Sequence, residues 1–319
     1  MKLHFQKQKK KLNKGKRPVR RKRKDDIETT VCSGWRTVPN NSLNPDVTFS
    51  VIIPAYNAEE YITEAMDSVI NQTTGEQIEL IIVDDCSTDN TFEVVNDYAR
   101  RHPSTANRSI VILRNSKNAG VAFSRNQGVN YAGGEYVAFL DADDWWDPKK
   151  LELQYELLLK KSNEVFFEAE KAEYEGRKPL NNYPVLCCTA RELADNKGVL
   201  FGKIIEVPES ITYEMLLKTN SIPCSSVLIK RQVALEFPMK RDDLHEDFLV
   251  WLKVTKKYGP ALGLNKPLLK SRMTPDGKSR NKIKSAKMQF KCYRYMHIGV
   301  IQSLWYLAHY AVAGYKKYN

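Results

Sequence analysis

Residues 78–89 read Ile-Glu-Leu-Ile-Ile-Val-Asp-Asp-Cys-Ser-Thr-Asp. The β-branched run from Ile78 to Val83 predicts a strand, and the polar residues after it offer N-caps to a helix from about Asn90 to Arg101. Apart from Glu79 the strand is continuously apolar and not alternating, so we expect both of its faces to be buried. A buried strand followed by a helix makes one βα unit.

The same arrangement recurs on both sides of this unit. Strands that alternate with helices favour parallel pairing through right-handed crossovers, so the sequence predicts an α/β fold with a mostly parallel, doubly wound sheet. Upstream, Pro54 closes the first strand, and downstream Gly133-Gly134 precedes the last one. The further strands and helices are predicted at 49–53 with 58–70, at 110–113 with 119–131, and at 136–140.

The regular alternation of predicted strands and helices stops after residue 147. Pro148 is suited to the first turn of a helix, whereas the charged stretch 164–182 has no apolar period and predicts irregular structure. The remaining elements are expected as a helix at 151–159, a hairpin within 185–207 around Asp195 to Gly198, a strand at 226–229, and helical segments at 248–254 and from 286 onward.

Composition narrows the class of protein. The chain has 319 residues and is 42% hydrophobic, enough for one large core, and it lacks the roughly 20 continuous apolar residues of a membrane span. No secretory signal is visible, so we expect a cytoplasmic protein. Six cysteines form no CxxC pair or zinc-spaced cluster and are interpreted as reduced thiols.

The net charge of +12 comes largely from the Lys/Arg-rich stretch between Lys2 and Lys24. A solvated disordered tail explains such a run, and contact with RNA or with an anionic membrane surface is the alternative. A translation start upstream of the true domain would also produce it. Nucleic-acid binding has no other support, because the rest of the chain lacks an aromatic and basic platform of known pattern.

Polar motifs follow the predicted strands at the points where each strand ends. They are Pro54-Ala55-Tyr56-Asn57, Asp84-Asp85, Asn115 to Asn118, and Asp141-Ala142-Asp143-Asp144. The carboxyl ends of parallel strands meet at one edge of a sheet, which is where such sheets bind ligands. Carboxylates so close together repel one another unless a cation or hydrogen bonds compensate them, although any single Asp is also a common cap or turn residue.

The last of these motifs has the spacing of a cation-binding turn. Carboxylates two residues apart in a turn, such as Asp141 and Asp143, can both reach Mg²⁺ or Mn²⁺, which accept one or two carboxylates and complete their shells with water and phosphate oxygens. Such a cation would bridge a diphosphate and neutralise charge on a departing nucleotide.

These motifs, in this order, resemble the inverting glycosyltransferases of family 2, which have the GT-A fold. The similarity covers about residues 49–160 and rests on Val51 to Asn57, Val83 to Asp89, Asn118-Ala119-Gly120 with Ser124-Arg125-Asn126, and Phe139 to Asp144.

The resemblance implies a role for each matching residue. Asp85 would hydrogen-bond the base, Arg125 would lie near the nucleotide and its phosphates, and Asp141 and Asp143 would form the metal-binding DXD motif. Pro54 and Tyr56 would line the nucleoside pocket, and the remaining nucleotide-binding candidates are Asn57, Asn118 and Ala142.

The family's catalytic base usually lies in an acidic pair at the start of a later helix, and Glu246-Asp247 resembles that pair. Asp247 would take the proton of an acceptor hydroxyl as its oxygen attacks the anomeric carbon opposite the leaving diphosphate, which inverts configuration. An acidic pair favoured by the helix dipole is the alternative interpretation. His245 is interpreted as a cap or surface residue.

The C-terminal region resembles that of a bacterial subgroup that builds capsule or O-antigen repeat units. The resemblance rests on Ser279 to Lys282, Ala286-Lys287, Tyr293-Arg294, Tyr310-Ala311 and Gly314 to Tyr318. That similarity implies a glycan on a polyprenyl-diphosphate lipid as acceptor. Trp305, Tyr306, Tyr310 and Tyr315 with Lys316 and Lys317 make an aromatic and basic helix, suited either to packing on the catalytic domain or to peripheral contact with the inner face of a membrane.

Together these expectations divide the chain into five parts. They are a basic disordered tail (1–25), a linker or arm (26–47), the nucleotide-sugar-binding GT-A half (48–160), an acceptor-binding half with the catalytic base (161–275), and C-terminal helices (276–319).

Three other functions have less support. A nucleotidyltransferase would carry a Gly-rich phosphate loop after the first strand, and a dinucleotide-binding oxidoreductase would carry GxGxxG there; Pro54 to Asn57 is neither. A catalytically silent relative that only binds a nucleotide sugar would keep the same binding motifs. Transfer assays on variants of Asp143 and Asp247 discriminate between it and an enzyme.

Overall fold

The computed structural model describes residues 29–31, 44, 47–178, 182–240, 244–273 and 282–318. The strands are β1 (Thr29–Val31), β2 (Phe49–Ala55), β3 (Ile78–Asp84), β4 (Arg108–Asn115), β5 (Tyr136–Phe139), β6 (Trp145–Trp146), β7 (Leu186–Ala194), β8 (Leu200–Ile205), β9 (Ser210–Ile211), β10 (Leu228–Lys230) and β11 (Ala261–Arg272). The helices are α2 (Ile62–Ile70), α3 (Thr91–Arg101), α4 (Val121–Tyr131), α5 (Lys150–Tyr174), α6 (Tyr213–Lys218), the 3₁₀ turn η1 (Cys224–Ser226), α7 (Arg231–Glu236), α8 (Glu246–Tyr258), α9 (Lys282–Tyr295) and α10 (Val300–Tyr318).

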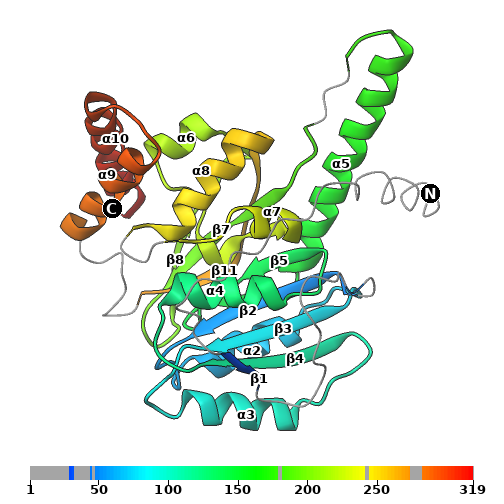
Figure 1. Cartoon of the computed structure of the whole chain (residues 1–319), viewed down its shortest axis with the longest axis vertical. Coiled ribbons are helices and arrows are strands. Elements are labelled where there is room, and N and C mark those ends of the chain that lie inside the picture. The colour runs from blue at the N-terminus through cyan, green and yellow to red at the C-terminus, as the bar shows by residue number, and fades with distance from the viewer. Residues whose placement is uncertain are drawn as a thin grey trace.

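Within the described residues all the strands belong to one mixed sheet (Figure 1). Its order is β1-β4-β3-β2-β5-β10-β7-β11-β6, and β8 and β9 pair with β7 and β11 respectively. Strands β4, β3, β2 and β5 are parallel to one another, as the alternation of strands and helices predicts. The α/β fold expected from the sequence is confirmed.

The parallel strands are buried on both faces. Ile52 and Ile81 point to a core that includes α4, whereas Val51, Ile53 and Leu80 point to a second core beneath α2 and α3. This two-sided burial is the physical reason for the continuous apolar runs in the sequence.

Helix α4 lies very close to the sheet. A Cβ atom at Gly128 would come within 2.5 Å of Ile52 Cγ2, so only glycine permits this approach of α4 to β2. The same helix carries Arg125, whose position therefore depends on this contact.

The second part of the chain continues the same sheet. Strand β10 lies antiparallel between β5 and β7, and β11 pairs in parallel with β7. The outermost strand β6, although it precedes α5 in the chain, pairs with β11. Strands from before and after residue 160 therefore interleave, and that predicted boundary lies inside α5.

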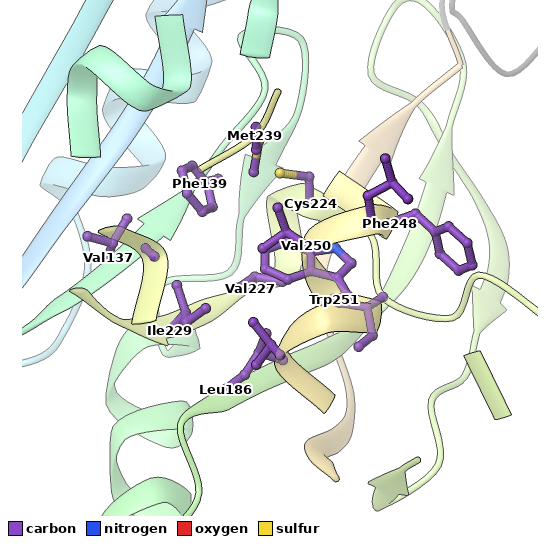
Figure 2. Close-up of a cluster of buried hydrophobic side chains, with 14 of the residues drawn as sticks. Val137, Phe139, Leu186, Cys224, Val227, Ile229, Met239, Phe248, Val250 and Trp251 are labelled. Carbon is purple, nitrogen blue, oxygen red and sulfur yellow. The ribbon is translucent and has the colours of Figure 1, made fainter. Parts of the chain in front are cut away.

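A buried cluster fixes α8 against the centre of the sheet (Figure 2). Trp251 and Phe248 of α8 are fully buried and belong to the same cluster as Leu186 and Ile229 of the neighbouring strands. Met239, from the segment before α8, belongs to the same cluster. This packing sets the position of the N-terminal turn of α8, which begins with Glu246-Asp247.

The largest difference from the sequence expectation is α5, which was predicted to end at residue 159 and continues to Tyr174. The stretch predicted to be irregular is helical because it is rich in Glu, Lys and Ala, which are strong helix formers. An ion pair one turn apart, Lys161 to Glu164, adds to this. In Figure 1 the C-terminal half of α5 extends away from the sheet, and among the described residues no side chain of α5 beyond Leu158 belongs to either core cluster.

Other boundaries differ less. Helices α2 and α4 begin four and two residues later than expected, at Ile62 and Val121. The C-terminal helical segment is two helices, separated by a turn in which His297 has a positive φ of 61°. Strand β11 was not predicted.

The two ends of the chain are described in part. Residues 29–31 of the predicted arm pair antiparallel with β4, whereas the basic tail lies outside the described residues. No helix in the described part is both long and apolar enough to span a bilayer.

Candidate active site

Four polar segments lie at one edge of the sheet, where the parallel strands end. They follow β2 at Ala55, β3 at Asp84, β4 at Asn115 and β5 at Phe139. Parallel pairing of these strands brings their carboxyl ends together, as the sequence predicted.

Asp85 is buried and connects two of these segments. Its Oδ1 accepts hydrogen bonds from Asn115 Nδ2 at 2.7 Å and from the Ala119 amide at 2.9 Å. Its Oδ2 accepts from the Gly120 amide at 2.7 Å, at the N-terminus of α4. The carboxylate thus orders the loop that contains the exposed Asn118; its contact with a base stays a prediction.

The loop after β2 has a fixed backbone and an exposed ring. Asn57 adopts a left-handed conformation with φ of 49°, and its Oδ1 accepts from the Thr88 amide at 2.9 Å. Pro54 is buried within β2, whereas Tyr56 is 48% exposed. An exposed aromatic side chain on an ordered loop is available to stack on a base.

The acidic turn after β5 is tied to the rest of the protein through Ser225. Ser225 Oγ accepts a hydrogen bond from the Asp141 amide at 3.1 Å, and Ala142 is buried beside it. Asp144 is also buried, and its Oδ1 accepts from the Arg272 amide at 2.9 Å. Burial, followed by the charges of Asp143 and Asp141, raises the pKa of Asp144 well above its ordinary value.

Arg272 holds this turn from the other side. Its Nε donates to the Asp143 carbonyl at 3.0 Å, its Nη1 donates to the Asn196 carbonyl at 3.0 Å, and its Nη2 pairs with Glu64. The guanidinium also lies 4.8 Å from the centroid of the Trp145 ring. One buried side chain therefore links the acidic turn, α2 and the β7–β8 hairpin.

Arg125 joins the acidic turn to α8. Its Nη2 lies 2.6 Å from Asp141 Oδ1, and its Nη1 lies 2.9 Å from Glu246 Oε1. The side chains of Arg125 and Glu246 are almost fully buried, whereas that of Asp141 is 39% exposed. Burial alone would lower the pKa of Arg125, but Cys224, Asp141 and Glu246 favour the charged form and raise this pKa well above its ordinary value. Contact of Arg125 with a nucleotide stays a prediction.

Asp247 is the next residue on the same helix turn. Burial first, and then the charge of Glu246, raises the pKa of its carboxyl to about 6, against the lowering effect of Arg125. A carboxyl with this pKa is ionised at neutral pH and can still accept a proton from a hydroxyl in a reaction. Its side chain remains partly exposed.

His245 contacts the C-terminal helices. Its Nε2 lies 3.2 Å from Ser285 Oγ and 3.3 Å from the Ser285 carbonyl. His245 is the N-cap residue of α8, but its side chain makes no capping hydrogen bond and is only partly exposed; the absence of a catalytic role stays a prediction.

The structure thus brings the acidic candidates to one region through Arg125; they are Asp141, Asp143, Glu246 and Asp247. The nucleotide-binding candidates border the neighbouring strand ends; they are Tyr56, Asn57, Asp85 and Asn118. Sequence reasoning missed Ser225, Arg272 and Glu64. No local motif marks these three residues, since each acts through contacts with segments far away in the chain.

Comparison with known proteins supports the interpretation of these motifs. The model for "Glycosyl transferase family 2" matches residues 50–183. TuaG of Bacillus subtilis, named as a glycosyltransferase of teichuronic acid biosynthesis, is 33% identical over 84% of this chain and 96% of its own. The chain belongs to glycosyltransferase family 2. A second relative of this family 2 enzyme, WfgD of Escherichia coli, is 30% identical over 86% of this chain and 96% of its own, and is named as a UDP-Glc:α-D-GlcNAc-diphosphoundecaprenol β-1,3-glucosyltransferase.

Solved structures of glycosyltransferases share the fold. The mannosyltransferase PcManGT of Pyrobaculum calidifontis, solved with GDP-Man and Mn²⁺, covers 98% of this chain and 80% of its own with a TM-score of 0.60 and 17% identity. Staphylococcus aureus TarS 1–349 with UDP-GlcNAc covers 83% of this chain and 72% of its own with a TM-score of 0.55 and 18% identity. At these identities the likeness establishes the GT-A fold of the family 2 enzyme.

The donor set of the acidic turn fits a hard divalent cation. Asp141 and Asp143 would supply oxygen ligands, and Asp141 remains accessible to solvent beside its ion pair with Arg125. Among the described residues no group of three or more His, Cys, Asp or Glu side chains is placed to hold a metal by itself. Mg²⁺ and Mn²⁺ in nucleotide sites take one or two carboxylates and obtain the other ligands from phosphate and water.

Proposed function

We propose that this family 2 enzyme transfers a hexose from a UDP-sugar to a hydroxyl of a glycan carried on a polyprenyl diphosphate. The reaction would invert configuration, depend on Mn²⁺ or Mg²⁺, and serve the synthesis of a cell-surface polysaccharide. The observation that carries the proposal is the link through Arg125 between the acidic turn and the Glu246-Asp247 pair. The names of WfgD and TuaG support the donor, the lipid carrier and the pathway class.

In the proposed donor site, Tyr56 stacks on the base while Asp85 accepts a hydrogen bond from it. Pro54, Asn57, Asn118 and Ala142 complete the nucleotide site. Asp141 and Asp143 would hold the cation, which when bound supplies charge neutralisation for the departing diphosphate.

In the proposed transfer, Asp247 accepts the proton of the acceptor hydroxyl. The hydroxyl oxygen forms a bond to the anomeric carbon as the bond from that carbon to the diphosphate breaks, and the electron pair leaves with the diphosphate. Attack and departure on opposite sides of the carbon invert it in one step. The pKa of Asp247, about 6, suits a base that works near neutral pH. Glu246, paired with Arg125, keeps the charged turn in position.

The test is transfer from a panel of UDP-hexoses, with Mn²⁺, to a synthetic GlcNAc-diphosphate lipid, measured by mass spectrometry and by UDP release. We expect one donor to be used, and we expect Asp143→Asn and Asp247→Asn to lose at least about 100-fold in kcat. Asp97→Asn, an exposed change on α3, is the matched control.

Two results would contradict the proposal. Full turnover in excess chelator would show that the reaction does not need a metal ion. Saturable binding of UDP-sugars without release of UDP from any donor and acceptor pair would identify a catalytically silent binding protein instead.

A further inference from the structure

Helix α10 is apolar on two opposite faces. On the inner face Ser303 is fully buried, and Tyr306 and Leu307 pack against the core cluster that contains α8. The outer face carries exposed apolar side chains at intervals of three, four or seven residues, and the exposed Ala308 and His309 lie within the longest interval. We call these the apolar stripe: Ile301 (85% exposed), Leu304 (54%), Trp305 (50%), Val312 (56%) and Tyr315 (68%).

The stripe is a continuous feature and not a scatter of single residues. Side chains three and four apart lie on one side of a helix, and the stripe from residue 301 to 315 extends over roughly 20 Å at 1.5 Å per residue. Isolated exposed apolar residues are ordinary, but a contiguous apolar surface marks a site of contact with a protein or a membrane.

The surroundings of the stripe are strongly basic. Residues 282–318 contain seven Lys or Arg and no Asp or Glu. On α9 the exposed side chains of Lys284, Lys287, Lys291 and Arg294 follow one another at helical spacing. Beside the stripe itself, Lys218 Nζ lies 5.6 Å from the centroid of the Trp305 ring.

The apolar stripe and the positive charge around it together decide between two partners, a second copy of the chain and an anionic bilayer. A second copy of the chain would bring two basic surfaces together, which like-charge repulsion opposes. An anionic bilayer satisfies both features, because its acyl boundary accepts the apolar side chains and its headgroups attract the cations. Tryptophan and tyrosine in the stripe are the residues that favour the interfacial region.

The two helices also contact the predicted acceptor side of the active site. Ser285 Oγ of α9 lies 3.2 Å from His245 Nε2 and 3.4 Å from Tyr310 Oη of α10. His245 immediately precedes Glu246-Asp247. The position of α9 and α10 is therefore set directly against the N-terminus of the helix that carries the predicted base.

We propose that α9 and α10 form a membrane-docking surface. The apolar stripe enters the interface of an anionic bilayer, and the lysines of α9 bind its headgroups. Docking there holds the Asp247 side of the active site near the bilayer, where a lipid-linked acceptor is presented. This last step rests on the proposed function, whereas docking itself does not.

The experiment measures binding of the full chain to vesicles by flotation. One set contains phosphatidylglycerol and phosphatidylethanolamine, and the other contains only phosphatidylcholine. The stripe variant is Ile301→Glu with Leu304→Glu. The matched control is Val199→Glu with Phe201→Glu, an equally exposed apolar pair on the β7–β8 hairpin. Every protein keeps the basic N-terminal stretch, so its contribution to binding is the same in all.

We expect the wild type and the hairpin control to bind anionic vesicles alike, and the stripe variant to bind about tenfold or more weakly. Trp305 fluorescence should shift to the blue with anionic vesicles, by comparison with Trp305→Phe. Equal binding by the stripe variant would overturn the proposal. So would a wild-type dimer in light scattering that the stripe variant converts to a monomer without any change in vesicle binding.

Activity separates this proposal from the proposed function. The stripe variant should keep wild-type transfer to a short, water-soluble acceptor analogue and lose rate only with acceptor embedded in vesicles. Absence of transfer to any acceptor by the wild type would contradict the proposed function and leave the vesicle result to decide on docking.

Discussion

Arg125 lies between two carboxylates that are far apart in the chain. Glu246 is buried and needs a cationic partner, since an unpaired buried charge is costly. Asp141 is half-exposed and belongs to the turn that is proposed to hold the metal. The planar fork of the guanidinium lets one side chain bond both, and so fixes the distance between the turn and α8.

We therefore expect Arg125→Lys to fold but to lose function. Lysine keeps the charge yet offers one ammonium group, which does not bond both carboxylates in their present positions. We expect kcat to fall by about tenfold or more and the free energy of unfolding to fall by about 1–3 kcal/mol, measured by transfer assays and urea denaturation. Arg100→Lys, on an exposed position of α3, should change neither. Unchanged kcat in Arg125→Lys would contradict this role.

Asp247 gives a prediction for the pH dependence of transfer. A base acts in its ionised form, and the pKa of this carboxyl is raised to about 6, chiefly by burial. We expect kcat/KM to rise as pH increases through about 6 and to level off above it, measured between pH 5 and 8. In Asp247→Asn, kcat/KM should no longer rise with pH, and it should be lower than in the wild type by a factor of about 10²–10⁴. If kcat/KM of Asp247→Asn rose with pH in the same way, the rise would belong to the titration of another group.

At the scale of single elements, the first turn of α5 contains a buried lysine. Lys150 Nζ donates to Gln154 Oε1 at 2.8 Å and lies 3.8 Å from the centroid of the Trp146 ring. Gln154 in turn donates to the carbonyls of Cys187 and Ser226, so this polar group ties α5 to the sheet. Burial lowers the pKa of Lys150 to about 7.

The lowered pKa predicts how stability changes with pH. An unfolded lysine keeps its proton up to about pH 10, so between pH 7 and 10 the unfolded chain binds more protons and stability should rise with pH. Lys150→Met should abolish this part of the rise and raise the free energy of unfolding at pH 7 by about 1–3 kcal/mol. Urea denaturation at pH 7 and 9.5 measures both, with the exposed Lys149→Met as control. Equal pH dependence in both variants would contradict it.

The elements also show what sequence can predict. Strands β2 to β5 and the motifs at their ends are predictable because their signals are local. Burial on both faces requires an unbroken run of apolar residues, and the capping residues follow that run directly in the chain. Strand β11 was missed because Gly263, Asn265 and Pro267 interrupt its apolar run, and its pairing with β7 is long-range. The predicted helix is shorter than α5 because the outer half of α5 is highly charged and contributes no side chain to either core cluster.

The same distinction holds for the site. The candidates at strand ends lie in local motifs, so their types and spacing identified them. Arg125 was identified as a binding residue, but its pairing with Glu246 depends on the packing of α4 and α8 and no local pattern carries it. Arg272 has no local signal at all, because its partners come from three separate segments.

At the scale of the whole molecule, the interleaved sheet predicts cooperative unfolding. Strand β6 from the first part of the chain pairs with β11 from the second, so neither part retains a complete sheet alone. We expect a single calorimetric transition that coincides with the loss of far-UV circular dichroism. UDP with Mn²⁺ at a hundred times its dissociation constant should stabilise the whole transition by about 2.7 kcal/mol. Two transitions, with only one shifted by ligand, would contradict this.

The short strand β1 has a practical consequence for anyone who shortens the protein. Thr29 to Val31 pair with the end of β4 and occupy the hydrogen-bonding groups of an outer strand of the sheet. A truncation that begins at residue 47, where the catalytic fold starts, would leave those groups open. An uncovered edge strand can pair with a strand of another molecule, so the shortened protein should self-associate. By covering the end of β4, the strand β1 thus limits aggregation.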